Sequence, residues 1–291
     1  MGEVKKFVKK VVGMIEKAAY LTASAISPDL LSELRYFRTF KKRINHKNPR
    51  TFAEKLILAM KSKEYEELGD YADKVKVRDY VREIAGEEYL IPLIAVYESP
   101  DDVDYDSIPE GAYIKLNHGS GYNYIYKASE KSEIEKKVRK AFKKDFSTFQ
   151  NERQYKNIER RIIVMPDMKE GSEIFFEASL FTINGRVEIA RVRGEDILFD
   201  VDRDYKVPPY HMFGNVREPI PEFESFHEVV ELAEKLAAPF EFVRLDFMFF
   251  DYKPYFCELT FSPNAGRVKF VPDEYNYIIG DKLKFEGYHR A

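Results

Sequence analysis

The chain has little that could cross-link it covalently or anchor it in a membrane. Its 291 residues include no tryptophan and one cysteine, Cys257, which excludes an intramolecular disulfide. No run approaches the roughly 20 apolar residues of a membrane-spanning helix, because Glu16 and Lys17 interrupt the best candidate, residues 11–26. Because a chain without disulfides fits a reducing compartment, we expect a cytoplasmic protein.

A strong net charge is absent as well. The 47 basic and 50 acidic residues leave a net charge of −3, which excludes a bulk polyanion binder. The 23 phenylalanines and 20 tyrosines follow strand periodicity rather than alternating with basic residues, so we expect no nucleic-acid partner. The average hides an asymmetry, because residues 1–50 hold 12 basic and 4 acidic residues, a net charge of +8, whereas the remainder has a net charge of −11.

Near the N-terminus, apolar residues recur at helical spacing and lysines occupy the other faces. This pattern predicts a basic amphipathic helix. Two interpretations stay open: the helix packs on its own protein, or residues 1–20 make a peripheral contact with an anionic membrane, which would place the protein at its inner face. The apolar residues are Val4, Phe7, Val8, Val11, Ile15 and Ala18, and the lysines are Lys5, Lys6, Lys9 and Lys10.

Helical patterns dominate the first 90 residues. Thr51 and Glu54 have the spacing of a capping box in front of an apolar run. A second helix over residues 71–84 is expected to end at Gly86, which can adopt the left-handed conformation of a helix end. Two later helices are expected to begin at Ser132–Glu135 and Ser225–Glu228, and to run toward Phe146 and Ala238.

Strand patterns dominate the rest of the chain, and the Asn184-Gly185 pair predicts a two-residue hairpin turn between two of them. Together with the helices they predict an antiparallel-rich α+β fold in two halves, with a ligand between them. The expected strands are 112–116, 122–126, 161–164, 173–183, 186–192, 242–250 and 255–261, and 89–96 is a short apolar run.

A lysine, Lys115, precedes the small-residue turn Gly119-Ser120-Gly121 and the next expected strand. Small residues let backbone N–H groups approach phosphate oxygens, and a lysine adds a point charge for the same anion. The pattern is not a Walker motif, because the lysine comes first and no helix follows. An ordinary hairpin turn beside a surface lysine remains the alternative.

Two carboxylates occupy neighbouring expected strands, Asp246 within Arg244-Leu245-Asp246 and Glu258 before Leu259. Strand alternation allows both to point to one face, where they repel each other unless a cation lies between them. Mg²⁺ suits such a pair. The alternative is that each carboxylate pairs with an arginine. Cys257 is expected to alternate away from Glu258 as a core thiol, and the scattered histidines predict no zinc site.

In their order and spacing, a set of short motifs resembles the TupA-like ATP-grasp family over residues 46 to 285. The resemblance implies an α+β ATP-grasp fold in which two α+β lobes hold ATP, preceded by a helical N-terminal region. It divides the chain into a basic arm (1–45), a helical region (46–98), a small lobe (99–160) and a large lobe with the metal site (161–291). The motifs are Asn48 to Lys55, Asp73-Lys74 with Val77-Arg78, Gly86 to Pro92, Lys115 to Gly121, Gln154 to Asn157 and Glu258 to Phe261.

The resemblance also implies ATP and Mg²⁺ as cofactors and roles for individual residues. Asp167 stands where the family usually has a hinge glutamate, the family's strand lysine is absent from Glu177 to Leu180, and Thr260 replaces a frequent asparagine near Asn264. The implied nucleotide contacts are Lys115, His118, Gly119, Ser120, Gly121, Val164, Met165 and Asp167; the metal ligands are Asp246, Glu258, Thr260 and Asn264; the catalytic residues are Lys115 and Arg244.

The expected activity is that of an ATP- and Mg²⁺-dependent carboxylate–amine ligase. The resemblance implies that it acts through an acyl phosphate on a cell-surface polysaccharide or its precursor, so the partner is a small molecule or glycan. Two alternatives stay open: a phospho- or glycosyltransferase of polysaccharide biosynthesis on the same scaffold, and a non-catalytic module that binds a nucleotide or glycan.

Overall fold

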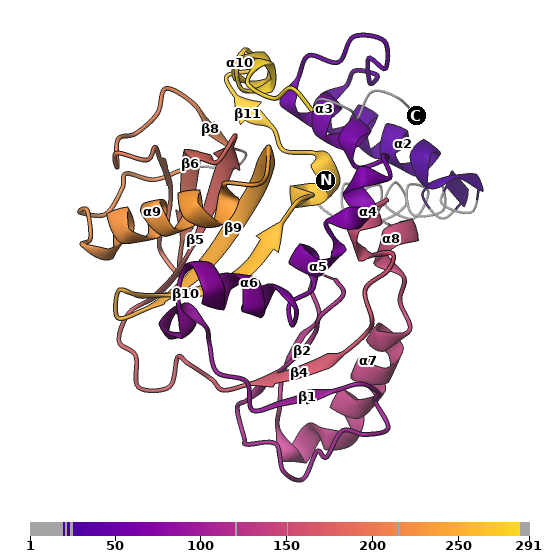
Figure 1. The fold of residues 1–291 in the computed structure, drawn as a ribbon, viewed down its shortest axis with the longest axis vertical. Coiled ribbons are helices and arrows are strands. Elements are labelled where there is room, and N and C mark those ends of the chain that lie inside the picture. The colour runs from indigo at the N-terminus through magenta and orange to yellow at the C-terminus, as the bar shows by residue number, and fades with distance from the viewer. Residues whose placement is uncertain are drawn as a thin grey trace, which may run out of the picture.

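A computed structural model describes residues 20, 22–23, 26–119, 121–149, 151–212, 214 and 216–285 (Figure 1). The amphipathic helix predicted within residues 1–20 lies almost wholly outside this part of the chain, and so does Ser120. None of the helices in the described part is both long enough and apolar enough to cross a membrane. The architecture is α+β, with two sheets in separate lobes and a layer of helices beside them.

The larger lobe is a five-stranded antiparallel sheet with the order β10-β9-β5-β6-β7. In β9, Leu245 and Phe247 are buried on one face while Arg244 and Asp246 are partly exposed on the other. Helix α9 (Ser225–Ala237) packs across the sheet and contacts β5, β6 and β9 (Figure 1). The strands are β5 (Phe175–Ile183), β6 (Arg186–Arg193), β7 (Leu198–Val201), β9 (Phe242–Phe250) and β10 (Lys253–Thr260).

The smaller lobe has a four-stranded sheet with the order β1-β4-β2-β3 and its own apolar core with helix α7 (Lys131–Phe142). The first and last strands of this sheet lie outside the range 99–160 that was expected for the small lobe. They pair with each other, so both belong to this lobe. The strands are β1 (Ala95–Tyr97), β2 (Tyr113–Leu116), β3 (Asn123–Ile125) and β4 (Ile162–Met165).

Helices from the N-terminal third lie beside both sheets (Figure 1). The capping box is confirmed: the Thr51 hydroxyl accepts from the Glu54 amide at 3.2 Å, and the Glu54 carboxylate accepts from the Thr51 amide at 3.0 Å. The remaining elements are α2 (Pro28–Phe40), α3 (Phe52–Ala59), α4 (Glu64–Glu67), α5 (Gly69–Ala72), α6 (Val77–Ile84), α8 (Phe146–Phe149), α10 (Tyr275–Asp281), the 3₁₀ turns η1 (Glu87–Tyr89), η2 (Ala128–Glu130), η3 (Arg153–Tyr155) and η4 (Pro263–Gly266), and the short strands β8 (His211–Met212) and β11 (Phe270–Val271).

The hairpin prediction is confirmed, since Asn184 and Gly185 have φ angles of 51° and 71° between β5 and β6. The single helix predicted over residues 71–84 is wrong. The structure has α5 and α6 with a loop between them, where the Asp73 carboxylate accepts from the Val75 amide at 2.8 Å and so competes with the helix. Helices α7 and α9 are present without the predicted side-chain caps.

Candidate functional site

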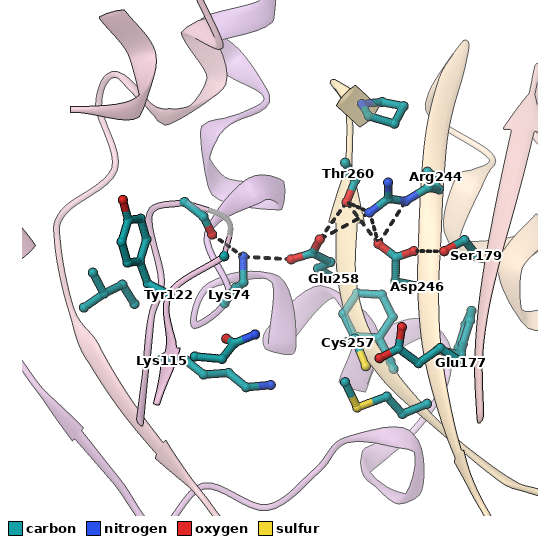
Figure 2. Close-up of a pocket in the computed structure, with 18 of the residues that line it drawn as sticks. Lys74, Lys115, Tyr122, Glu177, Ser179, Arg244, Asp246, Cys257, Glu258 and Thr260 are labelled. Carbon is teal, nitrogen blue, oxygen red and sulfur yellow. Dashed lines mark hydrogen bonds and ion pairs between the residues drawn. The ribbon is translucent and has the colours of Figure 1, made fainter. Parts of the chain in front are cut away.

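A cleft of about 540 Å³ lies between the two lobes. The small lobe contributes side chains from β2 and β4, the large lobe contributes β5, β9 and β10, and the loop before α6 contributes Lys74 (Figure 2). A polar cleft between lobes with convergent charged groups is where a ligand is expected. Of the predicted site residues, those that line it are Lys115, Gly119, Gly121, Met165, Arg244, Asp246, Glu258, Thr260 and Asn264.

In the strand register Glu258 of β10 lies directly opposite Asp246 of β9, so the two carboxylates share one face of the sheet, as predicted. The Thr260 hydroxyl lies 3.1 Å from Asp246 Oδ2 and 2.9 Å from Glu258 Oε1. Arg244 Nη2 reaches the same two oxygens, at 2.5 Å and 3.5 Å (Figure 2). The two acidic side chains therefore converge on one point, and an arginine holds them together.

Cys257 was predicted to point away from Glu258, and this is wrong. The register of β10 shifts between Phe256 and Glu258, so that Cys257 is the extra residue of a β-bulge. A bulge places two consecutive residues against one residue of the partner strand, and both Cys257 and Glu258 line the cleft. Burial raises the pKa of the Cys257 thiol to about 12, so it is not a nucleophile near neutral pH.

The two carboxyl groups have different electrostatic surroundings. Burial and the neighbouring charge of Glu258 raise the pKa of Asp246 against the opposing charge of Arg244. Burial also opposes the ionisation of Glu258, but Lys74 and Arg244 outweigh it and lower the pKa of Glu258 to about 2. Glu258 is therefore a constant negative charge, whereas a bound cation would favour the ionised form of Asp246.

Lys74 belongs to one of the motifs that resemble the family, but no sequence pattern indicates a role for its side chain. The Lys74 ammonium lies 2.8 Å from Glu258 Oε2 and donates to the Gly119 carbonyl at 2.9 Å (Figure 2). It thus joins the acidic pair of the large lobe to the glycine turn of the small lobe. Its position depends on the break between α5 and α6, which no sequence period indicated.

The predicted phosphate turn follows β2, and Lys115 projects from that strand into the cleft (Figure 2). Gly121 has a φ of +81°, a conformation that favours glycine. His118 lies elsewhere: it is buried in the small lobe with its ring edge-on to Phe142 at 5.9 Å. Burial, with the charges of Arg160 and Lys74, lowers the pKa of His118 to about 4.

A smaller hollow of about 150 Å³ adjoins the cleft at the connection after β4. Asp167 and Met165 line it together with the rings of Tyr113 and Phe250. Val164, another predicted contact, is fully buried in the small-lobe core. The lining of the hollow is therefore mainly apolar and aromatic, with two carboxylates, Asp167 and Glu177, and two lysines, Lys115 and Lys169, a composition that suits a flat heterocycle.

The opposite end of the cleft contains polar residues that sequence reasoning did not single out. Glu152 is buried and accepts from the Ser262 hydroxyl at 2.6 Å. Burial raises its pKa to about 7 against this hydrogen bond and the charge of Arg267. The turn that carries Asn264 is left-handed at that residue, with a φ of 52°. These residues come from η3, η4 and their flanks, and only the folded chain brings them together.

The position of the missing family lysine falls on β5. Ser179 occupies it and donates to Asp246 Oδ1 at 2.6 Å, so a small hydroxyl orients the carboxylate there (Figure 2). Two residues earlier, Glu177 pairs with Arg193 at 2.5 Å and lines both the cleft and the smaller hollow. This part of the site holds no extra cation from β5.

The residues around Asp246 fit a magnesium ion. Two carboxylates and the Thr260 hydroxyl form an all-oxygen donor set, which a hard cation prefers. Within the described ranges no group of three or more acidic, histidine or cysteine side chains could hold a metal alone. Mg²⁺ is usually held by one or two carboxylates plus waters and substrate phosphates, so a two-carboxylate site is sufficient.

Comparisons with known proteins place this geometry in a family context. Residues 54–284 match the family described as TupA-like ATPgrasp. No curated protein sequence matches the chain. Similar solved structures are an L-amino acid ligase from Bacillus licheniformis (14% identity, TM-score 0.44, 73% of this chain and 49% of that chain), an ADP complex of N5-carboxyaminoimidazole ribonucleotide synthetase (14%, 0.42, 69% and 48%) and a D-alanine–D-alanine ligase from Bacillus anthracis complexed with ATP (14%, 0.39, 65% and 54%). The chain spans about half the length of these structures.

Proposed function

The chain belongs to the TupA-like ATP-grasp family and has its α+β ATP-grasp fold, and from this premise we propose that it is an ATP- and Mg²⁺-dependent carboxylate–amine ligase. The observation that carries the proposal is the convergence of Asp246, Glu258 and Arg244 opposite Lys115 across one cleft. Paired carboxylates for a metal and cations for phosphates are the parts that phosphoryl transfer needs.

The nucleotide would lie along the cleft with its base in the aromatic hollow beside Met165 and Asp167. Its phosphates would then pass Lys115 and the glycine turn and end at the Asp246–Glu258 pair. Lys74, already bound to Gly119 and Glu258, would add a second positive charge near these phosphates. Asp246, Glu258 and the Thr260 hydroxyl would hold Mg²⁺, which when bound would supply positive charge against the charge that develops on the transferred phosphoryl group.

In the proposed reaction, a carboxylate oxygen of the acceptor attacks the γ-phosphorus of ATP and ADP leaves with the bonding pair. The acyl phosphate is then attacked by an amine, inorganic phosphate leaves, and the amine loses a proton. Arg244 is placed to stabilise the charge on the transferring group, because its guanidinium lies at the two metal-binding oxygens. By the family resemblance, the acceptor would be a cell-surface polysaccharide or its precursor, handled at the cytoplasmic side of the membrane.

The test measures binding and turnover separately. ATP with Mg²⁺ is expected to raise the melting temperature of the protein, and ADP is expected to form only when a uronic acid and an amine are both present. Asp246→Asn and Glu258→Gln should abolish turnover with the fold intact, whereas Glu222→Gln, an exposed residue paired with His227, should behave like the wild type. No stabilisation by ATP would contradict the proposal.

A non-catalytic nucleotide-binding module is the second candidate. It is favoured by the salt bridges that Arg244 and Lys74 make to the acidic pair, and by Ser179 in the position of the family lysine. The same experiment separates the two, because a binding module would be stabilised by ATP and Mg²⁺ but would release no ADP with any acceptor and amine.

A further inference from the structure

Arg267 is a half-buried cation of the cleft that forms no ion pair with any residue the structure describes. It lines the cleft just after η4, where its Nη1 makes a long contact of 3.4 Å with the Ala265 carbonyl. Among the described residues, no carboxylate oxygen lies within 4.0 Å of a guanidinium nitrogen of Arg267. Desolvating a guanidinium without a counter-ion is unfavourable, so such a residue indicates an anion that comes from a ligand.

A second arginine strengthens the positive charge at this place. Arg35 projects from α2 (Pro28–Phe40), and its charge, after burial, lowers the pKa of Arg267 to about 10. Glu152 is the acidic group that interacts electrostatically with both arginines. Because Glu152 is itself buried with a pKa raised to about 7, it carries less than one full negative charge near neutral pH.

The turn that carries Arg267 is held in place by a polar network. The Ser262 hydroxyl donates to Glu152 and accepts from Gln154 Nε2 at 2.5 Å. Helix α2 is fixed on the same side, because Asn151 donates to Asp29 Oδ1 at 2.9 Å. Asn151 therefore holds the helix of Arg35, and Glu152 and Gln154 hold the turn before Arg267, next to η3. The cationic end of the cleft is thus preorganised before a ligand binds.

This end of the cleft is distinct from the place proposed for the triphosphate. Met248 and Phe250 line the aromatic hollow, and Phe250 lies opposite Lys253 at the start of β10. Thr260 ends the same strand, so roughly 20 Å of strand separates the base from η4. The acidic pair lies between them, and a group bound at Arg267 would therefore approach the γ-phosphoryl group from the side away from the base.

We propose that Arg267, supported by Arg35, binds an oxyanion of the acceptor substrate at the end of the cleft remote from the base. The inference rests on the proposed function and deepens it, because it assigns specificity for an anionic acceptor to named residues. It also gives α2, which precedes the residues 54–284 of the family match, a part in substrate recognition. The oxyanion can be a carboxylate or a phosphate, since a guanidinium binds either in a bidentate manner.

The test compares three probes on the same sugar ring: glucose, glucuronate and glucose 6-phosphate. Their dissociation constants are measured by calorimetry with the full chain, both alone and in the presence of Mg²⁺ and a non-hydrolysable ATP analogue. We expect one of the two anionic probes to bind at least tenfold more tightly than glucose. The tighter of the two identifies the oxyanion as a carboxylate or a phosphate.

Variants assign the effect to the arginines. Arg267→Ala should raise the dissociation constant of the anionic probe about tenfold, and Arg35→Ala should raise it about threefold. The affinity for the ATP analogue should be unchanged in both variants. Arg38→Ala removes an exposed arginine one turn further along α2 and is the matched control, which should bind all probes like the wild type. Arg267→Lys keeps the charge and should restore part of the affinity, and melting temperatures confirm that each variant is folded.

Three results would overturn the inference: anionic probes that bind no more tightly than glucose, an Arg267→Ala variant with unchanged probe affinity, or an equal loss of affinity for the ATP analogue, which would make Arg267 a triphosphate contact. Failure of the proposed function is separate. If the ATP analogue does not bind, the titrations without nucleotide still report whether Arg267 selects an anion.

Discussion

Glu152 and His118 are buried ionisable residues with pKa shifts of opposite sign. Burial raises the pKa of Glu152 from 4.5 to about 7, so its contribution to stability is present below pH 4.5 and lost as the pH rises through 7. Burial lowers the pKa of His118 from 6.5 to about 4, so its contribution is present above pH 6.5 and lost as the pH falls through 4. The two dependences oppose each other between pH 4.5 and 6.5.

We expect single variants to reveal this balance in the free energy of unfolding. As the pH falls from 7 to 4.5, Glu152→Gln should lose stability relative to the wild type and His118→Gln should gain it, each by about 1–3 kcal/mol. Urea denaturation at several pH values measures both differences. Parallel pH profiles for wild type and variants would show that the two groups titrate normally in the folded protein.

At the scale of elements, the crossing of α3 and α10 depends on a glycine. A Cβ on Gly280 would lie 2.2 Å from the Arg50 carbonyl oxygen and 2.6 Å from the Phe52 amide nitrogen, which are backbone atoms that cannot rotate away. These atoms flank Thr51, the N-cap of α3. The close approach of the two helices therefore requires the absence of a side chain.

Gly280→Ala is expected to reduce the free energy of unfolding by at least about 2 kcal/mol, because α10 must move away from α3. Ile278→Ala on the exposed side of α10 is the control and should change it by less than about 1 kcal/mol. Urea denaturation of both variants checks this. A small effect of Gly280→Ala would mean that α10 is free to shift without loss of packing.

The β9–β10 pair shows where the alternation of side chains along a strand predicts their direction correctly and where it does not. Alternation correctly predicted that Leu245 and Phe247 are buried while Asp246 faces the cleft, because a regular strand has a period of two. The same rule failed at Cys257, where the bulge adds one residue to β10. A bulge is stabilised by contacts of the surrounding sheet, and the local sequence carries no clear signal for it.

At the scale of the whole molecule, Lys74 connects the two lobes through Glu258 on one side and the Gly119 carbonyl on the other. Its side chain is only 15% exposed, so this bridge is partly shielded from water. Removing the Lys74 side chain leaves Glu258 with one cationic neighbour fewer and removes the hydrogen bond to the Gly119 carbonyl. The separation of the lobes should therefore depend on this one side chain.

Lys74→Ala is expected to increase the radius of gyration measured by small-angle scattering without nucleotide, and to reduce the stabilisation by ATP and Mg²⁺. Lys76→Ala is the matched control, since Lys76 lies in the same loop but pairs with Asp70 at the exposed surface. The control should resemble the wild type in both measurements. An unchanged radius for Lys74→Ala would show that other contacts hold the lobes together.

The sequence by itself determined the α+β class, the capping box at Thr51, the turn at Asn184-Gly185 and the shared face of Asp246 and Glu258, because these follow from periods and caps within a few residues of chain. Only the tertiary structure decided that Lys74 bridges the lobes and that Glu152 and Arg267 meet at one end of the cleft. These contacts depend on the packing of segments that are 45 or more residues apart, which no local sequence pattern can predict.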